Sequence, residues 1–205
     1  MKLLVTAFEP FNGGTINPSQ LILEQLEAPI GTELIKVLLP VDFKATTNIL
    51  KQLLQEHQPD VVISLGQAGN RPEICVERVA VNLNCVRSSD GTRELADNAG
   101  EKPVDVPIAE DGPAAYFSTL PVWDLVEVIK AQNVAGATSY SAGTYVCNHV
   151  MYTVLHEAAK NYPEMKAGFI HVPFLPEQMQ GRKSGYAMEF DDMLKGVQAV
   201  VDSFA

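Results

Sequence analysis

Residues 139–148, which read SYSAGTYVCN, indicate the fold of this chain most clearly. The stretch predicts the end of a strand, a turn of small residues and the first turn of a helix, a unit typical of layered α/β folds. Cys147 falls in that first turn, where backbone N–H groups lack partners and the helix dipole is positive. Both effects favour a thiolate, the form of cysteine that attacks carbonyl groups. A cysteine that merely packs as a small hydrophobe is the commoner case, and position alone leaves both interpretations open.

Length and charge limit the class of protein. A chain of 205 residues can bury a sizeable core, and we expect one domain over residues 1–205. The formal net charge of -10 argues against nucleic acid and against an anionic membrane as partners. No apolar run approaches the roughly 20 residues of a membrane span, and the first residues indicate a strand and not a signal peptide.

The cysteines and histidines indicate neither a disulfide framework nor a metal site. Cys75, Cys85 and Cys147 have no framework spacing, which fits free thiols in a reducing cytoplasm. The histidines are scattered, and the chain has no Cys-x-x-Cys pair, dinucleotide fingerprint or P-loop. We therefore expect neither a metal nor a cofactor.

Strand and helix patterns alternate along the chain. Strands are expected at residues 2–7, 33–39, 61–65, 74–83, 136–140 and 167–171, and helices at 17–27, 43–57, 122–129, 147–160 and 190–204. The run at 61–65 is apolar without alternation, which indicates a strand covered on both faces. The alternation predicts an α/β layered fold with a mainly parallel sheet.

Glu77 is out of place within the strand expected at 74–83. The alternation puts its carboxylate on an apolar face, where a charge must be paired or functional. A structural ion pair with Arg78 or another cation and a catalytic role are both open.

His171 is the best-placed base for a cysteine nucleophile, which needs a base and an acceptor that orients it. It ends a short apolar strand, at the sheet edge where we also expect Cys147. His149, only two residues after Cys147, should point away from it. Glu77 could then hold the imidazole by its other nitrogen. The alternative is a core histidine with satisfied hydrogen bonds.

Several segments resemble type I pyroglutamyl peptidases, also called pyrrolidone carboxyl peptidases. The resemblance is carried by GQAG at 66–69 with ICVERVAVN at 74–82, SAGTYVCN at 141–148, GFIHVP at 168–173, FEPF at 8–11 and YFSTLP at 116–121. It covers essentially the whole chain, in order. Two departures occur: Cys75 stands where the family usually has Ser or Thr, and Asn12-Gly13 replaces the commoner Gly-Gly.

The resemblance implies a three-layer α/β/α sandwich with a mainly parallel central sheet, of the phosphorylase/hydrolase-like kind, and usually a homotetramer. It implies a cysteine peptidase that removes N-terminal pyroglutamate from peptides. In that family pattern Cys147 is the nucleophile, His171 the general base and acid, and Glu77 the orienting carboxylate.

The resemblance also implies a binding site around this triad. Arg87, ten residues after Glu77, would help to hold the oxyanion, with backbone N–H groups near Gln67 and Cys147. The substrate-binding residues would be Phe8, Phe11, Asn17 and Tyr145. Two alternatives stay open: a related cysteine amidase for another cyclic or acyl amide, and a non-catalytic binding module.

Overall fold

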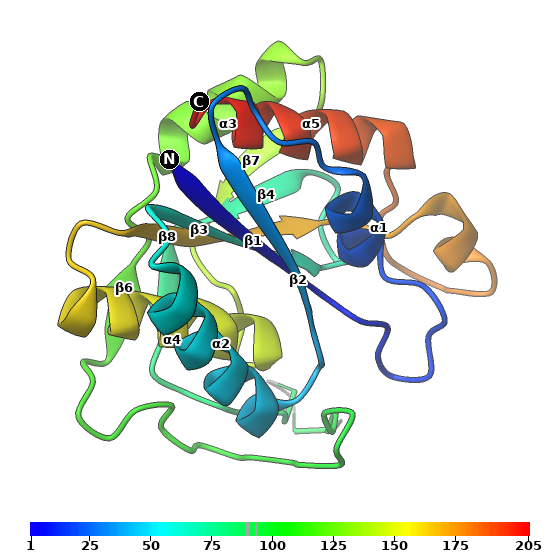
Figure 1. The fold of residues 1–205 in the computed structure, drawn as a ribbon. Coiled ribbons are helices and arrows are strands. Elements are labelled where there is room, and N and C mark those ends of the chain that lie inside the picture. The colour runs from blue at the N-terminus through cyan, green and yellow to red at the C-terminus, as the bar shows by residue number, and fades with distance from the viewer. Residues whose placement is uncertain (89–90, 93) are drawn as a thin grey trace.

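A mixed, mostly parallel sheet runs through the centre of the protein (Figure 1). The computed structural model describes residues 1–88, 91–92 and 94–205. Across these residues six strands lie in the order β2-β1-β3-β8-β4-β7. They are β1 (Lys2–Phe8), β2 (Glu33–Leu39), β3 (Val61–Gln67), β4 (Ile74–Glu77), β7 (Gly136–Ser139) and β8 (Lys166–Val172). The first three run parallel to β8, whereas β4 is antiparallel to β8 and parallel to β7.

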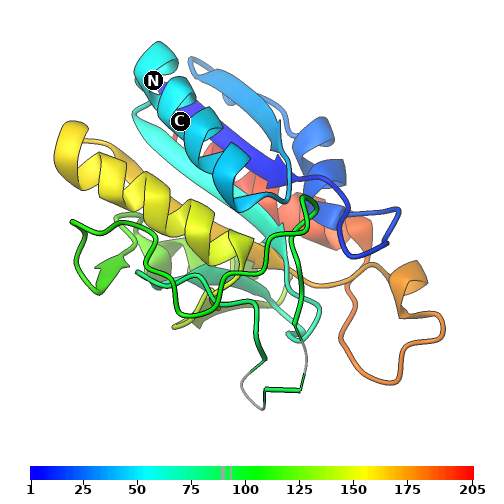
Figure 2. The ribbon, with the colours of Figure 1, turned by 90° about the horizontal axis from the view of Figure 1, so that it is seen from below.

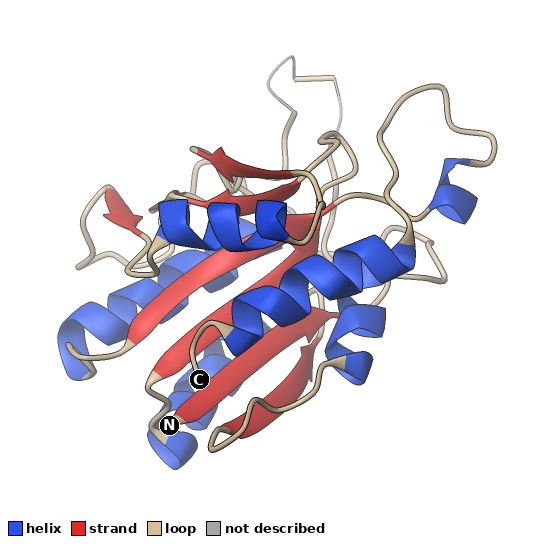
Figure 3. Ribbon diagram, turned by 90° about the horizontal axis from the view of Figure 1, so that it is seen from above, coloured by secondary structure: helices blue, strands red, loops and turns tan. Residues whose placement is uncertain are grey.

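Helices cover both faces of this sheet, as Figures 2 and 3 show from opposite sides. One face carries α1 (Pro18–Gln25), α3 (Val122–Ala131) and α5 (Phe190–Asp202), and the other carries α2 (Phe43–His57) and α4 (Val146–Asn161). The predicted three-layer α/β/α sandwich with a mainly parallel sheet is confirmed.

Side-chain alternation in β1 explains why two cores form. Successive strand residues point to opposite faces. Leu3 and Val5 therefore pack in the core under α1, α3 and α5, while Leu4 packs in the core under α2 and α4. All three side chains are fully buried, so β1 is covered on both sides.

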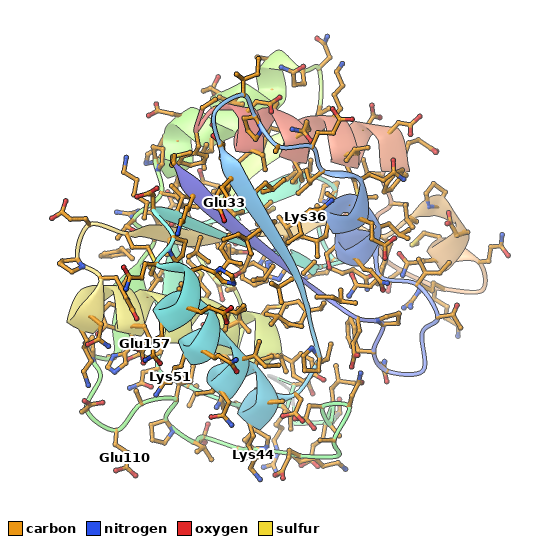
Figure 4. The ribbon with its side chains drawn as sticks, in the orientation of Figure 1. Glu33, Lys36, Lys44, Lys51, Glu110 and Glu157 are labelled. Carbon is orange, nitrogen blue, oxygen red and sulfur yellow. The ribbon has the colours of Figure 1, made fainter. Side chains whose placement is uncertain are left out.

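The pair α2 and α4 closes the second face. Their apolar sides pack together on this face of the sheet. At their outer edge Lys51 Nζ lies 3.5 Å from Glu157 Oε1 (Figure 4). Because Lys51 is largely exposed, this ion pair adds little, and the apolar packing stabilises the layer. In the described part of the chain, every helix is too short or too polar to cross a bilayer.

The prediction of one strand over residues 74–83 is wrong. β4 stops at Glu77, and β5 (Val79–Val81) pairs with β6 (Ala115–Phe117) in a separate two-stranded sheet. The last residue pair of β4 with β7 is Glu77 with Ser139, where β7 also ends. Beyond that point β4 has no partner strand in the main sheet, so the chain turns at Arg78 and pairs elsewhere.

Candidate active site

Cys147 is the second residue of α4, as the sequence predicts. The residue before the helix, Tyr145, provides no side-chain hydrogen bond to cap it. The first N–H groups of α4 therefore have no side-chain cap and lie where Cys147 borders a cavity. Such N–H groups can bind negative charge that develops on a substrate.

His171 reaches this helix end from β8, although not by the route that the sequence suggests. Because β4 and β7 run opposite to β8, the loops after β7 and β8 leave the sheet in opposite directions. Residues 140–145 then lead the chain back to the start of α4. Gly66 of β3 pairs in register with His171, and the absence of a side chain on Gly66 makes room for the sulfur of Cys147.

His171 and Glu77 form a buried pair. His171 Nδ1 lies 2.7 Å from Glu77 Oε1, and the two side chains are only 5% and 0% exposed. Since an ionised carboxylate can only accept a hydrogen bond, Nδ1 carries the proton and Nε2 is left as the basic nitrogen. This is the arrangement in which a carboxylate orients a catalytic imidazole.

Glu77 is held in its ionised form. Burial alone raises the pKa of a carboxyl group, but His171, the neighbouring Ser139 hydroxyl and the charge of Arg71 outweigh it. Together they hold the pKa of Glu77 below its usual value. The carboxylate is therefore available to stabilise a positively charged imidazole during a reaction.

The surroundings of Cys147 favour its neutral thiol form. Burial, followed by the negative charge of Glu77, raises its pKa to about 12, whereas its backbone N–H and Arg71 lower it. The helix N-terminus thus contributes as expected, but desolvation outweighs it. A base must therefore take the thiol proton as the sulfur attacks. The sequence position at a helix start suggested a thiolate, whereas the structure makes the imidazole necessary as that base.

Arg71 is a site residue that no pattern in the sequence indicated. Its Nη1 contacts Glu77 Oε1, and its Nη2 donates to the carbonyl of Ser141, 2.6 Å away. The cation paired with Glu77 is therefore Arg71, whereas Arg78 donates to the Ser118 carbonyl. The sequence indicated that Glu77 needs a cation nearby. It did not indicate Arg71, because this residue lies in the loop six positions before Glu77 and outside the strand pattern.

A cavity of about 550 Å³ joins most of the predicted site residues. Its lining includes Phe8, Phe11, Asn17, Gln67, Tyr145, Cys147 and His171. The volume is within the usual range for a small-molecule site. One wall is aromatic, with the rings of Phe11 and Tyr145 centred 6.2 Å apart. The cavity therefore offers a small flat group both apolar walls and nearby reactive side chains.

Two polar residues of the lining are already engaged. Asn17 caps α1 by accepting from the Ser19 N–H and hydroxyl, and its amide donates to the carbonyl of Glu9. Gln67 accepts through Oε1 from Gln178 at 2.9 Å, which ties the cavity edge to the loop after β8. Asn17 thus shapes the cavity mainly by holding the start of α1.

The structure does not bring Arg87 to Cys147. Arg87 is exposed, its Nη2 lies 3.0 Å from Glu94 Oε1, and it lines a neighbouring cavity. Tyr145 borders both cavities. The role of Arg87 at the oxyanion stays a prediction.

His149 lies away from the nucleophile, as its position in the helix predicts. Its Nε2 is 2.7 Å from Thr47 Oγ1, and its Nδ1 is 3.1 Å from Asn84 Oδ1. Burial lowers its pKa to about 4, so it is a neutral, hydrogen-bonded core residue at neutral pH.

Comparison with known proteins agrees with this geometry. The sequence profile described as Pyroglutamyl peptidase matches residues 1–205 of the chain. The chain belongs to the pyroglutamyl peptidase family. The resemblance drawn from the short sequence segments is confirmed, and with it the assignment to a family of hydrolases that act on peptides.

Relatives within the pyroglutamyl peptidase family match over nearly their whole length. Pyrrolidone-carboxylate peptidase 1 of Caldanaerobacter subterraneus subsp. tengcongensis is 44% identical over 202 residues, 98% of this chain and 96% of the relative. A pyrrolidone-carboxylate peptidase of Thermoanaerobacter sp. (strain X514) is 42% identical over 206 residues, covering 100% and 98% of the two chains.

Solved structures in the pyroglutamyl peptidase family have the same fold. Pyroglutamyl peptidase I from Bacillus amyloliquefaciens matches with a TM-score of 0.90 at 38% identity, over 98% of this chain and 92% of that one. A mutant pyrrolidone carboxyl peptidase from Pyrococcus furiosus gives 0.90 at 36% identity, over 98% and 97%. The α/β/α sandwich is thus shared from end to end.

Proposed function

We propose that this chain is a cysteine exopeptidase that removes N-terminal pyroglutamate from peptides through a Cys147–His171–Glu77 triad. The observation that carries the proposal is the buried pair of His171 and Glu77, whose imidazole lines the same cavity as Cys147. The cysteine stands at a helix start without a side-chain cap, where backbone N–H groups can hold an oxyanion.

The cavity suits a pyroglutamyl group. That group is a small neutral lactam without a free α-amine, so its site requires no acidic group to bind an ammonium. Flat aromatic walls with a few hydrogen-bonding groups fit such a ring. Phe8, Phe11 and Tyr145 provide the walls, and Gln67, whose side-chain oxygen already accepts from Gln178, borders them.

The reaction proceeds in two stages. His171 Nε2 takes the thiol proton while Sγ of Cys147 bonds to the acyl carbon, and the negative oxygen is held by N–H groups at the start of α4. His171 then gives that proton to the leaving amine as the C–N bond breaks, which leaves a thioester. In the second stage His171 takes a proton from water, whose oxygen attacks the thioester and frees pyroglutamate, and the thiolate regains its proton.

Arg87 and the backbone near Gln67 are proposed as further oxyanion donors. The ion pair of Arg87 with Glu94 is largely exposed, and such pairs contribute about 1 kcal/mol or less. A swing of the Arg87 side chain toward the shared wall at Tyr145 is therefore cheap. Removing one oxyanion donor costs about 10²–10³ in kcat, which mutation of Arg87 can measure.

The setting of the enzyme follows from weaker observations. We propose a cytoplasmic location because Cys75, Cys85 and Cys147 are all free thiols. We propose a homotetramer from the family resemblance, and a single peptidase domain over residues 1–205 because strands from both ends of the chain share one sheet.

A panel of aminomethylcoumarin amides tests this function. We expect release of the fluorophore from the pyroglutamyl amide, little from the prolyl and glutaminyl amides, and loss of activity after iodoacetamide treatment. A preference for another amide in the panel would instead support the related cysteine amidase. Turnover that is indifferent to iodoacetamide would contradict the cysteine mechanism.

A further inference from the structure

Arg71 joins the two halves of the catalytic site. It lies in the loop between β3 and β4, and its side chain is 23% exposed where it lines the cavity. One arm of the guanidinium contacts Glu77 Oε1, the oxygen that His171 Nδ1 also contacts. The other arm donates to the Ser141 carbonyl at 2.6 Å.

The contact with Glu77 is not an ordinary surface ion pair. The Glu77 side chain is fully buried, so its charge needs close partners to remain ionised. Its second oxygen, Oε2, is buried without a hydrogen-bond partner in the described part of the chain. The two close donors, one from His171 and one from Arg71, therefore meet at Oε1, and the neighbouring Ser139 hydroxyl adds to their effect on the charge.

The contact with Ser141 acts on the nucleophile. Residues 141–143 form the turn that leads into α4, and Gly143 within it has a φ of +80°, a conformation that glycine adopts readily. Arg71 is hydrogen-bonded to this turn at the Ser141 carbonyl. The planar guanidinium has donors in fixed directions, so it can set the distance between Glu77 and the turn before Cys147.

We propose that Arg71 is a positioning residue for catalysis, because one guanidinium fixes the carboxylate that orients His171 and the turn that presents Cys147. The proposal rests on the proposed function. Arg71 also adds positive charge to the site, which lowers the pKa of both Glu77 and Cys147. Loss of Arg71 should thus disturb geometry and charge together.

Three variants test this role: Arg71→Met, Arg71→Lys and, as a matched control, Arg78→Met. Arg78 also donates to a carbonyl and lies one residue after Glu77, but it packs over the Phe117 ring outside the cavity. We expect Arg71→Met to lower kcat on the pyroglutamyl amide by about 10²-fold with little change in KM, as a misplacement near 1 Å does. Lysine keeps the charge without the two-armed geometry, so Arg71→Lys should recover part of the loss, and Arg78→Met should match the wild type.

The rate of Cys147 alkylation at varied pH is a second readout. Loss of a residue with a purely structural role would leave this rate unchanged. The rate is followed by mass spectrometry of the Cys147 peptide, which separates it from Cys75 and Cys85. In Arg71→Met the alkylation rate at each pH between 7 and 9 should be lower than in the wild type, because a positive charge that lowers the thiol pKa is gone and the thiolate fraction falls. In Arg78→Met it should stay at the wild-type value.

The outcomes separate the two proposals. Wild-type kcat and an unchanged alkylation rate in Arg71→Met would overturn the positioning role, and so would a loss confined to KM, which would make Arg71 a substrate-binding residue. If Arg71→Met does not fold, the kcat of Arg71→Lys tests the geometric part of the role, since lysine keeps the charge and should leave the alkylation rate near the wild-type value. If the wild-type chain does not cleave the pyroglutamyl amide, the proposed function fails, while the alkylation rates still decide whether Arg71 acts on Cys147.

Discussion

Substitution of Gly66 by alanine tests how closely the nucleophile is packed. A Cβ on Gly66 would lie 2.7 Å from Cζ of Phe169 and 3.0 Å from Sγ of Cys147. Carbon and sulfur atoms in ordinary contact are about 3.5–4.0 Å apart. The Phe169 ring is fully buried, so the packed core resists the shift of roughly 0.8–1.3 Å that would relieve the contact with the ring, and the sulfur of Cys147 must also move by roughly 0.5–1 Å.

The displacement predicts two separate effects of Gly66→Ala. Overpacking a core position costs about 1–3 kcal/mol of unfolding free energy. A shift of about 1 Å in a reacting atom can cost about 10²-fold in rate, because the near-attack geometry is lost. We therefore expect a modest loss of stability together with a large loss of kcat/KM per folded molecule.

Gly168→Ala is the matched control. Gly168 lies on β8, and an added Cβ would meet Ser118 Oγ at 2.4 Å and Leu120 Cδ1 at 2.6 Å, away from the nucleophile. Its variant should lose comparable stability in urea unfolding while keeping wild-type kcat/KM per folded molecule on the pyroglutamyl coumarin amide. Equal activity in both variants would refute the claim that Gly66 makes room for the catalytic sulfur.

Three further predictions follow from the contacts described above. Glu77→Gln should lower kcat by about 10²–10⁴-fold, because the amide no longer holds the imidazole in the required tautomer, and a wild-type kcat would contradict the triad. His149 has its pKa lowered to about 4 from 6.5, so below pH 6.5 the unfolded chain binds a proton that the folded chain does not. The free energy of unfolding should therefore fall by roughly 3 kcal/mol between pH 6.5 and 4, as denaturant unfolding can measure. In His149→Gln this part of the pH dependence should be absent. Tyr145→Phe removes the hydroxyl that donates to the Ala96 carbonyl at 2.9 Å but keeps the aromatic wall, so it should cost about 1 kcal/mol of stability and change KM little; a large rise in KM would show that the hydroxyl binds substrate.

Local patterns were enough for most of the secondary structure. The helix at 43–57 appears with the predicted bounds because its apolar residues repeat at helical spacing, and the strand at 33–39 does so because Pro40 ends it. The strand at 74–83 failed because alternation continues through Arg78, whereas pairing does not. Partner strands, which lie far away in the sequence, decide where such a strand ends.

Candidate site residues could be predicted where residue type indicates the chemistry. Strand directions and loop contacts in the site could not be predicted in this way. Cys147 stood out at a helix start and Glu77 on an apolar strand face, whereas His171 was singled out by its place at the end of an apolar strand. The antiparallel direction of β4 and the loop contact of Arg71 with Glu77 arise from tertiary packing, which no local pattern records. Residues in such loops require the folded arrangement to be recognised.

The most direct test of the account is to trap the acyl-enzyme. The protein is mixed with a pyroglutamyl chromogenic amide, quenched rapidly in acid, digested and mapped by mass spectrometry, with Cys147→Ala treated in parallel. The account predicts a pyroglutamyl thioester on Cys147 alone, and no adduct and no turnover in the variant, which should still fold. An adduct on another residue, or turnover by Cys147→Ala at the wild-type rate, would contradict it.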